Sequence, residues 1–153
     1  MDLRAKLQAA TKDAMKARDS DRLSTLRLIG AAVKDREIAA RTGDGDGTLT
    51  EADLIQILSK MVKQRQESAR AYEEGGRLEL AAKEEQEIAI IQEFLPRQMT
   101  EEETRAAIDA AVSETGAEGL RDMGRVMGVL KERHAGQMDF GAAGGLVKAR
   151  LMN

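Results

Sequence analysis

Cysteine is absent from the sequence, and histidine occurs once, as His134. Without cysteine the chain can form no disulfide, no thiolate metal site and no cysteine nucleophile. A serine nucleophile would need a base beside it, and no nucleophile-elbow motif accompanies the single histidine. We therefore expect no catalytic residues and no cofactor, and we interpret His134 as a charge near a helix C-terminus.

Long apolar runs and aromatic residues are also scarce. No run approaches the roughly 18 apolar residues of a membrane span, and the start Met1-Asp2-Leu3-Arg4 does not read as a signal peptide. We expect a cytoplasmic protein with no membrane partner. Aromatic residues make up only 2% of the chain, so the core must consist of Leu, Ile, Val, Met and Ala, and stacking on single-stranded bases is disfavoured.

Charge of either sign is abundant but unevenly distributed. Residues 1–41 contain ten Lys and Arg against six Asp and Glu, whereas residues 42–96 contain six against twelve. From Gly119 onward, six basic residues face three acidic ones. This is not the strongly basic balance of a non-specific nucleic-acid binder, and we expect no DNA partner, although a local patch could still contact phosphates.

Apolar residues recur at helical spacing along the chain, and strand-like alternation is not visible. The fold class is therefore predicted to be all-α. Cap residues and glycines set the expected helix limits. The expected helices run from Asp2 to about Arg18, Asp19 to about Arg41, Thr50 to Gly75, Arg77 to the joint at Pro96, Thr100 to Gly116, Arg121 to Gly136, and Asp139 to Leu151.

The only proline, Pro96, interrupts this helical pattern. Proline disfavours helical geometry at the residue before it, so the fourth helix should stop near Leu95. Thr100 and Glu103 form a capping-box pattern that begins the next helix. We predict an N-terminal four-helix domain at residues 1–95, a hinge at 96–99, and a small three-helix tail domain at 100–153.

The segment Thr42–Asp53 resembles an EF-hand loop in its middle positions, which include Asp44, Asp46 and Gly47. Its ends differ, because Thr42 stands at the first position and Asp53 stands where the bidentate Glu is usual. Calcium binding and a plain flexible loop are both open from sequence, although Thr50 and Asp53 are already explained as helix-start residues. We assign no metal site.

Gly124 and Gly128 lie four residues apart on one face of the expected sixth helix. Each costs up to about 1 kcal/mol of helix propensity relative to Ala, so the pair requires a reason. Close helix packing is one explanation, and a bare backbone face approached by a partner such as RNA is the other. On the second explanation the candidate RNA-binding residues are Arg121, Gly124, Arg125, Gly128, Lys131, Arg133, Lys148 and Arg150.

Several segments together resemble the GatB/YqeY family over essentially the whole chain. They are the capped start before Leu23–Ile29, the joint Glu93-Phe94-Leu95-Pro96-Arg97-Gln98-Met99, Gly116-Ala117, and Asp122-Met123-Gly124-Arg125-Val126-Met127-Gly128. The joint and the Met-Gly-x-Val-Met-Gly segment are the specific parts. The family's late Gly-x-x-Asp-Gly pattern departs here, because an extra residue, Phe140, precedes Gly141.

The resemblance implies a small all-helical protein of two domains, similar to the C-terminal region of the B subunit of the tRNA-dependent amidotransferase. It links the chain to tRNA handling and to carbon–nitrogen ligation with glutamine as the amido donor, without implying catalysis by this chain. Expected partners are tRNA and an amidotransferase or other translation-related protein. The alternatives are a helical protein–protein adaptor without RNA binding and, more remotely, an autonomous amidotransferase.

Overall fold

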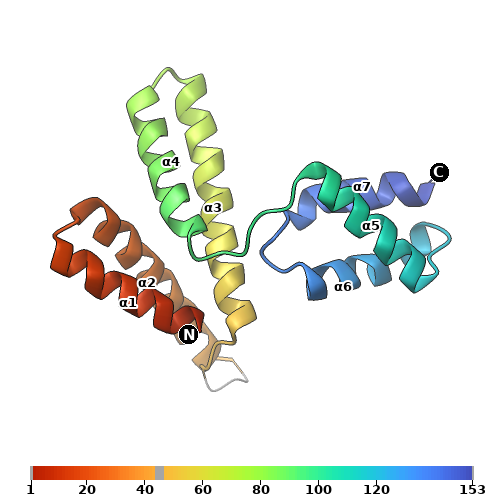
Figure 1. The fold of residues 1–153 in the computed structure, drawn as a ribbon, viewed down its shortest axis with the longest axis horizontal. Helices are drawn as coiled ribbons and strands as arrows, with labels where there is room; N and C mark the ends of the chain where they lie inside the picture. The colour runs from red at the N-terminus through yellow and green to blue at the C-terminus, as the bar shows by residue number, and fades with distance from the viewer. Residues whose placement is uncertain (1, 44–46, 153) are drawn as a thin grey trace. The chain divides into compact units, whose positions relative to one another are not determined.

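The computed structural model describes residues 2–43 and 47–152, where all regular secondary structure is helical (Figure 1). The prediction of an all-α fold is confirmed. Internal contacts divide the chain into two compact units, residues 1–95 and 96–153. The helices are α1 (Leu3–Ala17), α2 (Ser20–Arg41), α3 (Glu51–Glu74) and α4 (Leu78–Gln92) in the first unit, and α5 (Glu101–Thr115), the 3₁₀ turn η1 (Leu120–Asp122), α6 (Met123–Arg133) and α7 (Phe140–Met152) in the second.

Five helices begin at the cap residues that the sequence indicates. The carboxylates of Asp2 and Asp19 accept backbone N–H groups of the first turns of α1 and α2, at 2.8 and 3.2 Å. Thr50 and Thr100 form complete capping boxes at α3 and α5. Asp139 accepts the N–H of the second residue of α7 at 2.8 Å. Local side chains thus satisfy helix-start donors that would otherwise have no partner.

Two predicted helix ends differ from the structure. Helix α4 ends at Gln92, three residues before Leu95, and Phe94 and Leu95 pack against the first unit's core after the helix has ended. Helix α6 ends at Arg133 rather than at Gly136, which instead takes a positive φ of 77° in the following turn. After α4 the last apolar residues belong to a packed turn, and after α6 the glycine marks a turn that follows the helix, so the expected helices are a few residues too long.

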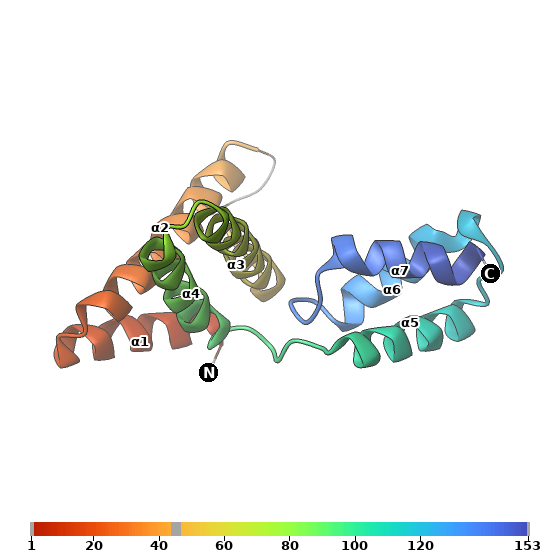
Figure 2. The ribbon, with the colours of Figure 1, turned by 90° about the horizontal axis from the view of Figure 1, so that it is seen from above.

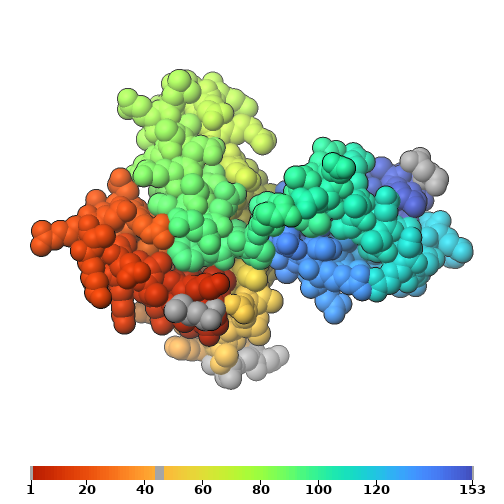
Figure 3. Space-filling model, viewed as in Figure 1, coloured from red at the N-terminus to blue at the C-terminus, as the bar shows by residue number. Residues whose placement is uncertain are grey.

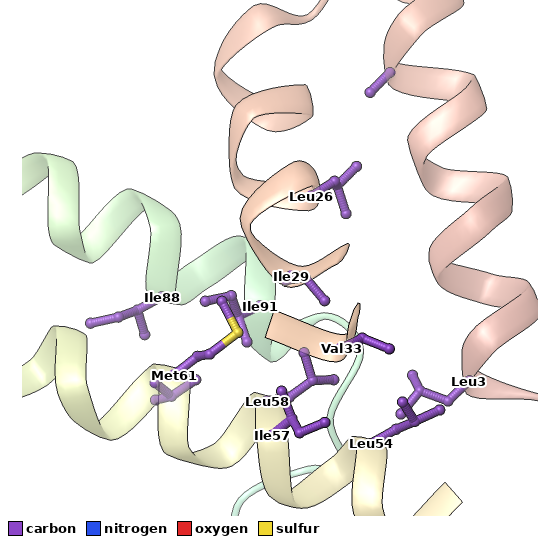
Figure 4. Close-up of a cluster of buried hydrophobic side chains, with 12 residues drawn as sticks. Leu3, Leu26, Ile29, Val33, Leu54, Ile57, Leu58, Met61, Ile88 and Ile91 are labelled. Carbon is purple, nitrogen blue, oxygen red and sulfur yellow. The ribbon is translucent and has the colours of Figure 1, made fainter. Parts of the chain in front are cut away.

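The core of the first unit forms where the α1–α2 hairpin meets the α3–α4 hairpin. Leu58 of α3, Ile91 of α4 and Ile29 of α2 are almost fully enclosed, with relative exposures of 0%, 0% and 1%. Figure 4 shows Leu58 and Met61 pointing from α3 toward α2 and α4. Aliphatic side chains fill this core, as the low aromatic content requires.

The far end of the α3–α4 hairpin extends beyond α1 and α2 (Figures 1 and 3). Here α3 and α4 pack against each other through the small residues Ala69 and Ala81, which are 2% and 3% exposed. Arg65 and Glu87 join the two helices by an ion pair of 2.9 Å. Small side chains allow close approach, so this part of the hairpin is held by its own contacts.

The second unit is a three-helix arrangement of α5, α6 and α7 (Figure 2). Val126 and Leu130 of α6 and Val147 of α7 are at most 1% exposed and form its centre. The segment before α5 is tied to the α6–α7 turn because the Met99 N–H donates to the Gln137 carbonyl at 2.8 Å. Residues 97–99 are therefore fixed to the second unit.

The EF-hand-like segment is only partly covered, because Asp44 and Asp46 lie outside the described residues. Thr50 and Asp53 bond to each other's backbone N–H groups in the α3 capping box. Within residues 2–43 and 47–152, no three His, Cys, Asp or Glu side chains gather as a metal site would require. Over the same ranges, no helix has the length and apolarity needed to span a membrane.

Candidate nucleic-acid interface

The candidate RNA-binding residues all lie in the second unit, on η1, α6 and α7. Helix α6 buries Val126 and Leu130 against its neighbours. At 100° per residue, Gly124, Gly128 and Lys131 lie on the opposite side of the helix, and all three are exposed. The structure thus brings both glycines and one cation together on the outer face of α6.

Neither glycine of α6 is needed for helix packing. A Cβ added at Gly124 or Gly128 would meet no atom of the described structure within 4 Å, beyond its own helix and chain neighbours. The close-packing explanation of these glycines is therefore wrong. Closer packing within the described part of the unit therefore does not offset the cost of these glycines in helix propensity.

Arg125 is partly committed to the structure of the unit itself. Its guanidinium donates to the Asp122 carboxylate at 2.5 Å and to the Thr115 carbonyl at 3.3 Å. These bonds hold the end of α5 to the start of α6. The side chain is nevertheless 60% exposed, so one edge of the guanidinium faces solvent.

Two further candidate arginines bind acidic residues of α5. Arg133 pairs with Glu114 through both terminal guanidinium nitrogens, and Arg150 donates to Asp109 at 3.0 Å. Arg121, Lys131 and Lys148 have no ion pair within the described part of the chain. The structure therefore separates the predicted cations into three that bind their own unit and three that are free to bind a partner.

Asp122 has a role that its position as the expected start of the sixth helix did not reveal. One carboxylate oxygen accepts the Glu118 N–H at 3.0 Å, and the other accepts from Arg125. The Glu118 N–H and the Arg125 guanidinium lower the pKa of Asp122 to about 2. Asp122 thus closes the loop that leads into α6 and positions the glycine-bearing face. The sequence signal for this role is the position of Asp122 at the end of a short glycine-containing loop, just before a helix.

An open hollow of about 380 Å³ lies beside this helix bundle, between the start of α5 and the start of α7. Its two carboxylates are already engaged, because Glu101 pairs with Arg105 at 2.8 Å and Asp139 caps α7. Met99, Met138 and Leu146 supply much of the remaining lining. Neither a nucleophile with its base nor a pair of free acids is presented there.

Together these features define an all-α protein in which a four-helix unit precedes a small three-helix unit with an exposed glycine-bearing helix. The sequence model of the family described as Yqey-like protein matches residues 4–151. The chain therefore belongs to the YqeY-like protein family.

Several curated fungal relatives carry the name "Altered inheritance of mitochondria protein 41, mitochondrial". The protein of Vanderwaltozyma polyspora is 37% identical over 58% of this chain and 46% of its own length. The protein of Lachancea thermotolerans is 35% identical over 74% of this chain and 57% of its own. The chain thus spans about half the length of the curated relatives it matches.

The cytoplasmic location predicted from sequence is contradicted by these relatives, which are named as mitochondrial proteins. The physical reason for the error is plain. A lack of cysteine and of long apolar runs suits any reducing aqueous compartment, so neither feature separates the cytoplasm from the interior of an organelle.

Proposed function

We propose that this protein is a non-catalytic accessory module that binds tRNA through the outer face of α6. The supporting observation is the exposure of Gly124 and Gly128, which no contact in the described structure explains. A helix without side chains at these positions lets a ribose-phosphate backbone approach the peptide groups closely. Arg121, Lys131 and Lys148 supply unpaired cations for phosphates.

Arg125, Arg133 and Arg150 enter this proposal with a smaller role. Each already has a carboxylate partner, so contact with a phosphate would have to share or replace that partner. Surface ion pairs contribute only about 0–1 kcal/mol, so such sharing is energetically accessible. We nevertheless assign most of the phosphate binding to the three cations without an ion pair.

The test is binding of the purified chain to total tRNA and to an unstructured RNA of matched length, titrated across salt. Arg121→Glu with Lys131→Glu should weaken tRNA binding and reduce the magnitude of the salt slope by about 1 for each phosphate that the variant no longer binds. Lys63→Glu with Lys83→Glu is the control, because it changes net charge equally on exposed positions of α3 and α4. Equal tRNA affinity in all three proteins would contradict the proposal.

An association with an amidotransferase is the more specific form of this proposal. It is supported by the resemblance of the joint and of Asp122–Gly128 to the C-terminal region of the amidotransferase B subunit. In that form the chain holds tRNA while another protein transfers the amide. The names of the yeast relatives support the mitochondrion as the compartment in which the chain would have this role.

We also propose that the two units pivot about the backbone single bonds on either side of the Leu95–Pro96 peptide, because the peptide bond itself is planar. On one side, Glu93 pairs with Arg22 at 2.6 Å, and Leu95 packs on the first core. On the other side, Arg97 pairs with Glu103 at 2.7 Å within the second unit. Because each flank is attached to its own unit and the proline ring fixes φ of Pro96, rotation is confined to the ψ angles of Leu95 and Pro96. Residual dipolar couplings that fit one common alignment tensor for both units would contradict the pivot.

A protein–protein adaptor is the second candidate function. Leu78 and Leu80 at the start of α4 are 67% and 40% exposed on the projecting hairpin. An adaptor that uses them would bind its partner with little salt dependence and would lose that binding in Leu78→Ser with Leu80→Ser. Salt-sensitive tRNA binding that is unchanged in this variant would favour the RNA-binding function.

A further inference from the structure

Helix α2 of the first unit carries a glycine in its middle that has no structural explanation. Gly30 is exposed, and a Cβ at this position would meet nothing within 4 Å among the described atoms outside its helix and chain neighbours. The helix has 22 residues, from Ser20 to Arg41, and continues unbroken through the glycine. The residue therefore lowers helix propensity without ending the helix, bending it into a turn or making room for a neighbour.

Cations flank this glycine on the same side of α2. Arg27 precedes it by three residues and Lys34 follows it by four, and these are the spacings that place side chains on one helix face. Arg27 and Lys34 are both exposed, and their Cα atoms are about 10.5 Å apart along the axis. The bare backbone at Gly30 lies between them.

The charged groups around this face leave its positive potential uncompensated. Glu37, at the edge of the face, is neutralised by Arg4 of α1 at 2.8 Å. Asp21 and Asp35 of α2 lie about 100° or more around the helix from Lys34 and about 80° or more from Arg27. In the part of the chain that the structure describes, neither Arg27 nor Lys34 has an ion pair. Arg41 continues the row, but its side chain lies against Gly47.

We propose that the face of α2 formed by Arg27, Gly30 and Lys34 is a second contact for the sugar-phosphate backbone of RNA. The choice of RNA as the polyanion rests on the proposed function. Two unpaired cations suit successive phosphates, and the missing side chain at Gly30 lets the strand approach the helix between them. Ser24 and Ala31, also exposed on this side, add no bulk that would hold the strand away.

The test uses the full chain and total tRNA across salt, with three double variants. Arg27→Glu with Lys34→Glu changes the α2 face, and Arg121→Glu with Lys131→Glu changes one cation of η1 and one of the α6 face. Lys63→Glu with Lys83→Glu is the charge-matched control. The α2 variant should weaken binding beyond the control and reduce the magnitude of the salt slope by about 2, at about 1 for each of two lost phosphate contacts. Circular dichroism establishes that each variant is folded.

The outcomes separate this proposal from the proposed function. Weakening only in the α6 variant overturns the α2 contact and leaves the α6 site intact. Weakening only in the α2 variant supports the α2 contact and overturns the α6 assignment. Absence of tRNA binding by the unchanged chain overturns both. Binding to vesicles of anionic lipid that depends on Arg27 and Lys34, with no effect of these residues on tRNA, also overturns the α2 contact.

A neutral substitution tests the role of the bare backbone separately from charge. Gly30→Gln should raise the thermal midpoint, because a side chain there is unhindered and favours helix, and yet it should weaken tRNA binding several-fold. Ala31→Gln is the control for added bulk on the neighbouring position. An unchanged affinity in Gly30→Gln would show that the glycine has no part in the contact.

Discussion

The two units use their surface cations differently. In the second unit, Arg125, Arg133 and Arg150 bind Asp122, Glu114 and Asp109, so half of the basic residues from Gly119 onward hold helices together. The first unit also has ion pairs, at Arg4, Arg22 and Arg65, but its helix α2 presents Arg27 and Lys34 without one in the described structure. The number of cations available to a partner is therefore the number of basic residues minus those already held in internal ion pairs.

The units also differ in how much core they possess. The first buries large aliphatic side chains from four helices, including Ile29, Leu58 and Ile91. The second has three short helices and a smaller core, in which Ala111 of α5 and Ala143 of α7 stand among the buried residues. Because small cores leave little margin of stability, local devices such as caps and loop clamps should matter more in the second unit.

The largest expected effect tests whether the two cores are independent. Leu58→Ala in the first unit and Leu130→Ala in the second should each cost about 2–5 kcal/mol of unfolding free energy, because both leucines are fully buried. Amide hydrogen exchange by NMR should show protection lost in the mutated unit only. Loss of protection in both units from either change would mean that they unfold together.

A smaller effect compares the capping boxes of the two units. Thr50→Ala and Thr100→Ala each remove one side-chain acceptor at a helix start, at a cost of about 1 kcal/mol. We expect the second unit to show the larger shift in thermal midpoint, since the same loss acts on a smaller core. Calorimetry checks this, with Thr→Ser at each position as the control that retains the hydroxyl. A larger shift for Thr50→Ala would contradict the comparison.

Acid should act on the second unit through Asp122. The pKa of Asp122 is lowered to about 2 from an ordinary value of 3.8, so the stability that it contributes is present above the unfolded pKa and is lost as pH falls from about 4 toward 2. In Asp122→Asn, the unfolding midpoint of the second unit should depend less on pH over this window. Glu132→Gln serves as the control. The same pH dependence in Asp122→Asn and in the unchanged protein would exclude this role.

The smallest expected effect is a gain in stability. Gly30→Ala in α2 and Gly128→Ala in α6 should each stabilise their unit by up to about 1 kcal/mol, because the added methyl meets no neighbour. Denaturant unfolding measures this change. At Gly116, whose φ is 68°, the same substitution should destabilise. A loss of stability at Gly30 or Gly128 would mean that these positions are tighter than the structure shows.

Much of the fold could be predicted because its helix limits are set locally. Asp2, Asp19, Thr50, Thr100 and Asp139 act within the first turn that follows them, so sequence spacing alone identified them as caps. The ends of α4 and α6 could not be predicted in this way. There, packing of Phe94 and Leu95 and the tie between Met99 and Gln137 depend on residues brought together by the tertiary fold.

The candidate site was predictable in its location and not in its detail. Gly124 and Gly128 stand out in the sequence, but only the surroundings of α6 show that no neighbour packs on them. The pairing of Arg133 with Glu114 and of Arg150 with Asp109 joins residues 19 and 41 positions apart. Such contacts follow from how α5, α6 and α7 pack, which helical periodicity does not specify.

The proposed function requires that tRNA contact the exposed glycines of α6. Its most direct test measures stability and tRNA affinity together in Gly124→Gln with Gly128→Gln, beside the control Glu132→Gln on the same helix. We expect equal or greater stability in this variant, with tRNA affinity reduced at least several-fold. Equal stability with unchanged tRNA affinity would contradict it.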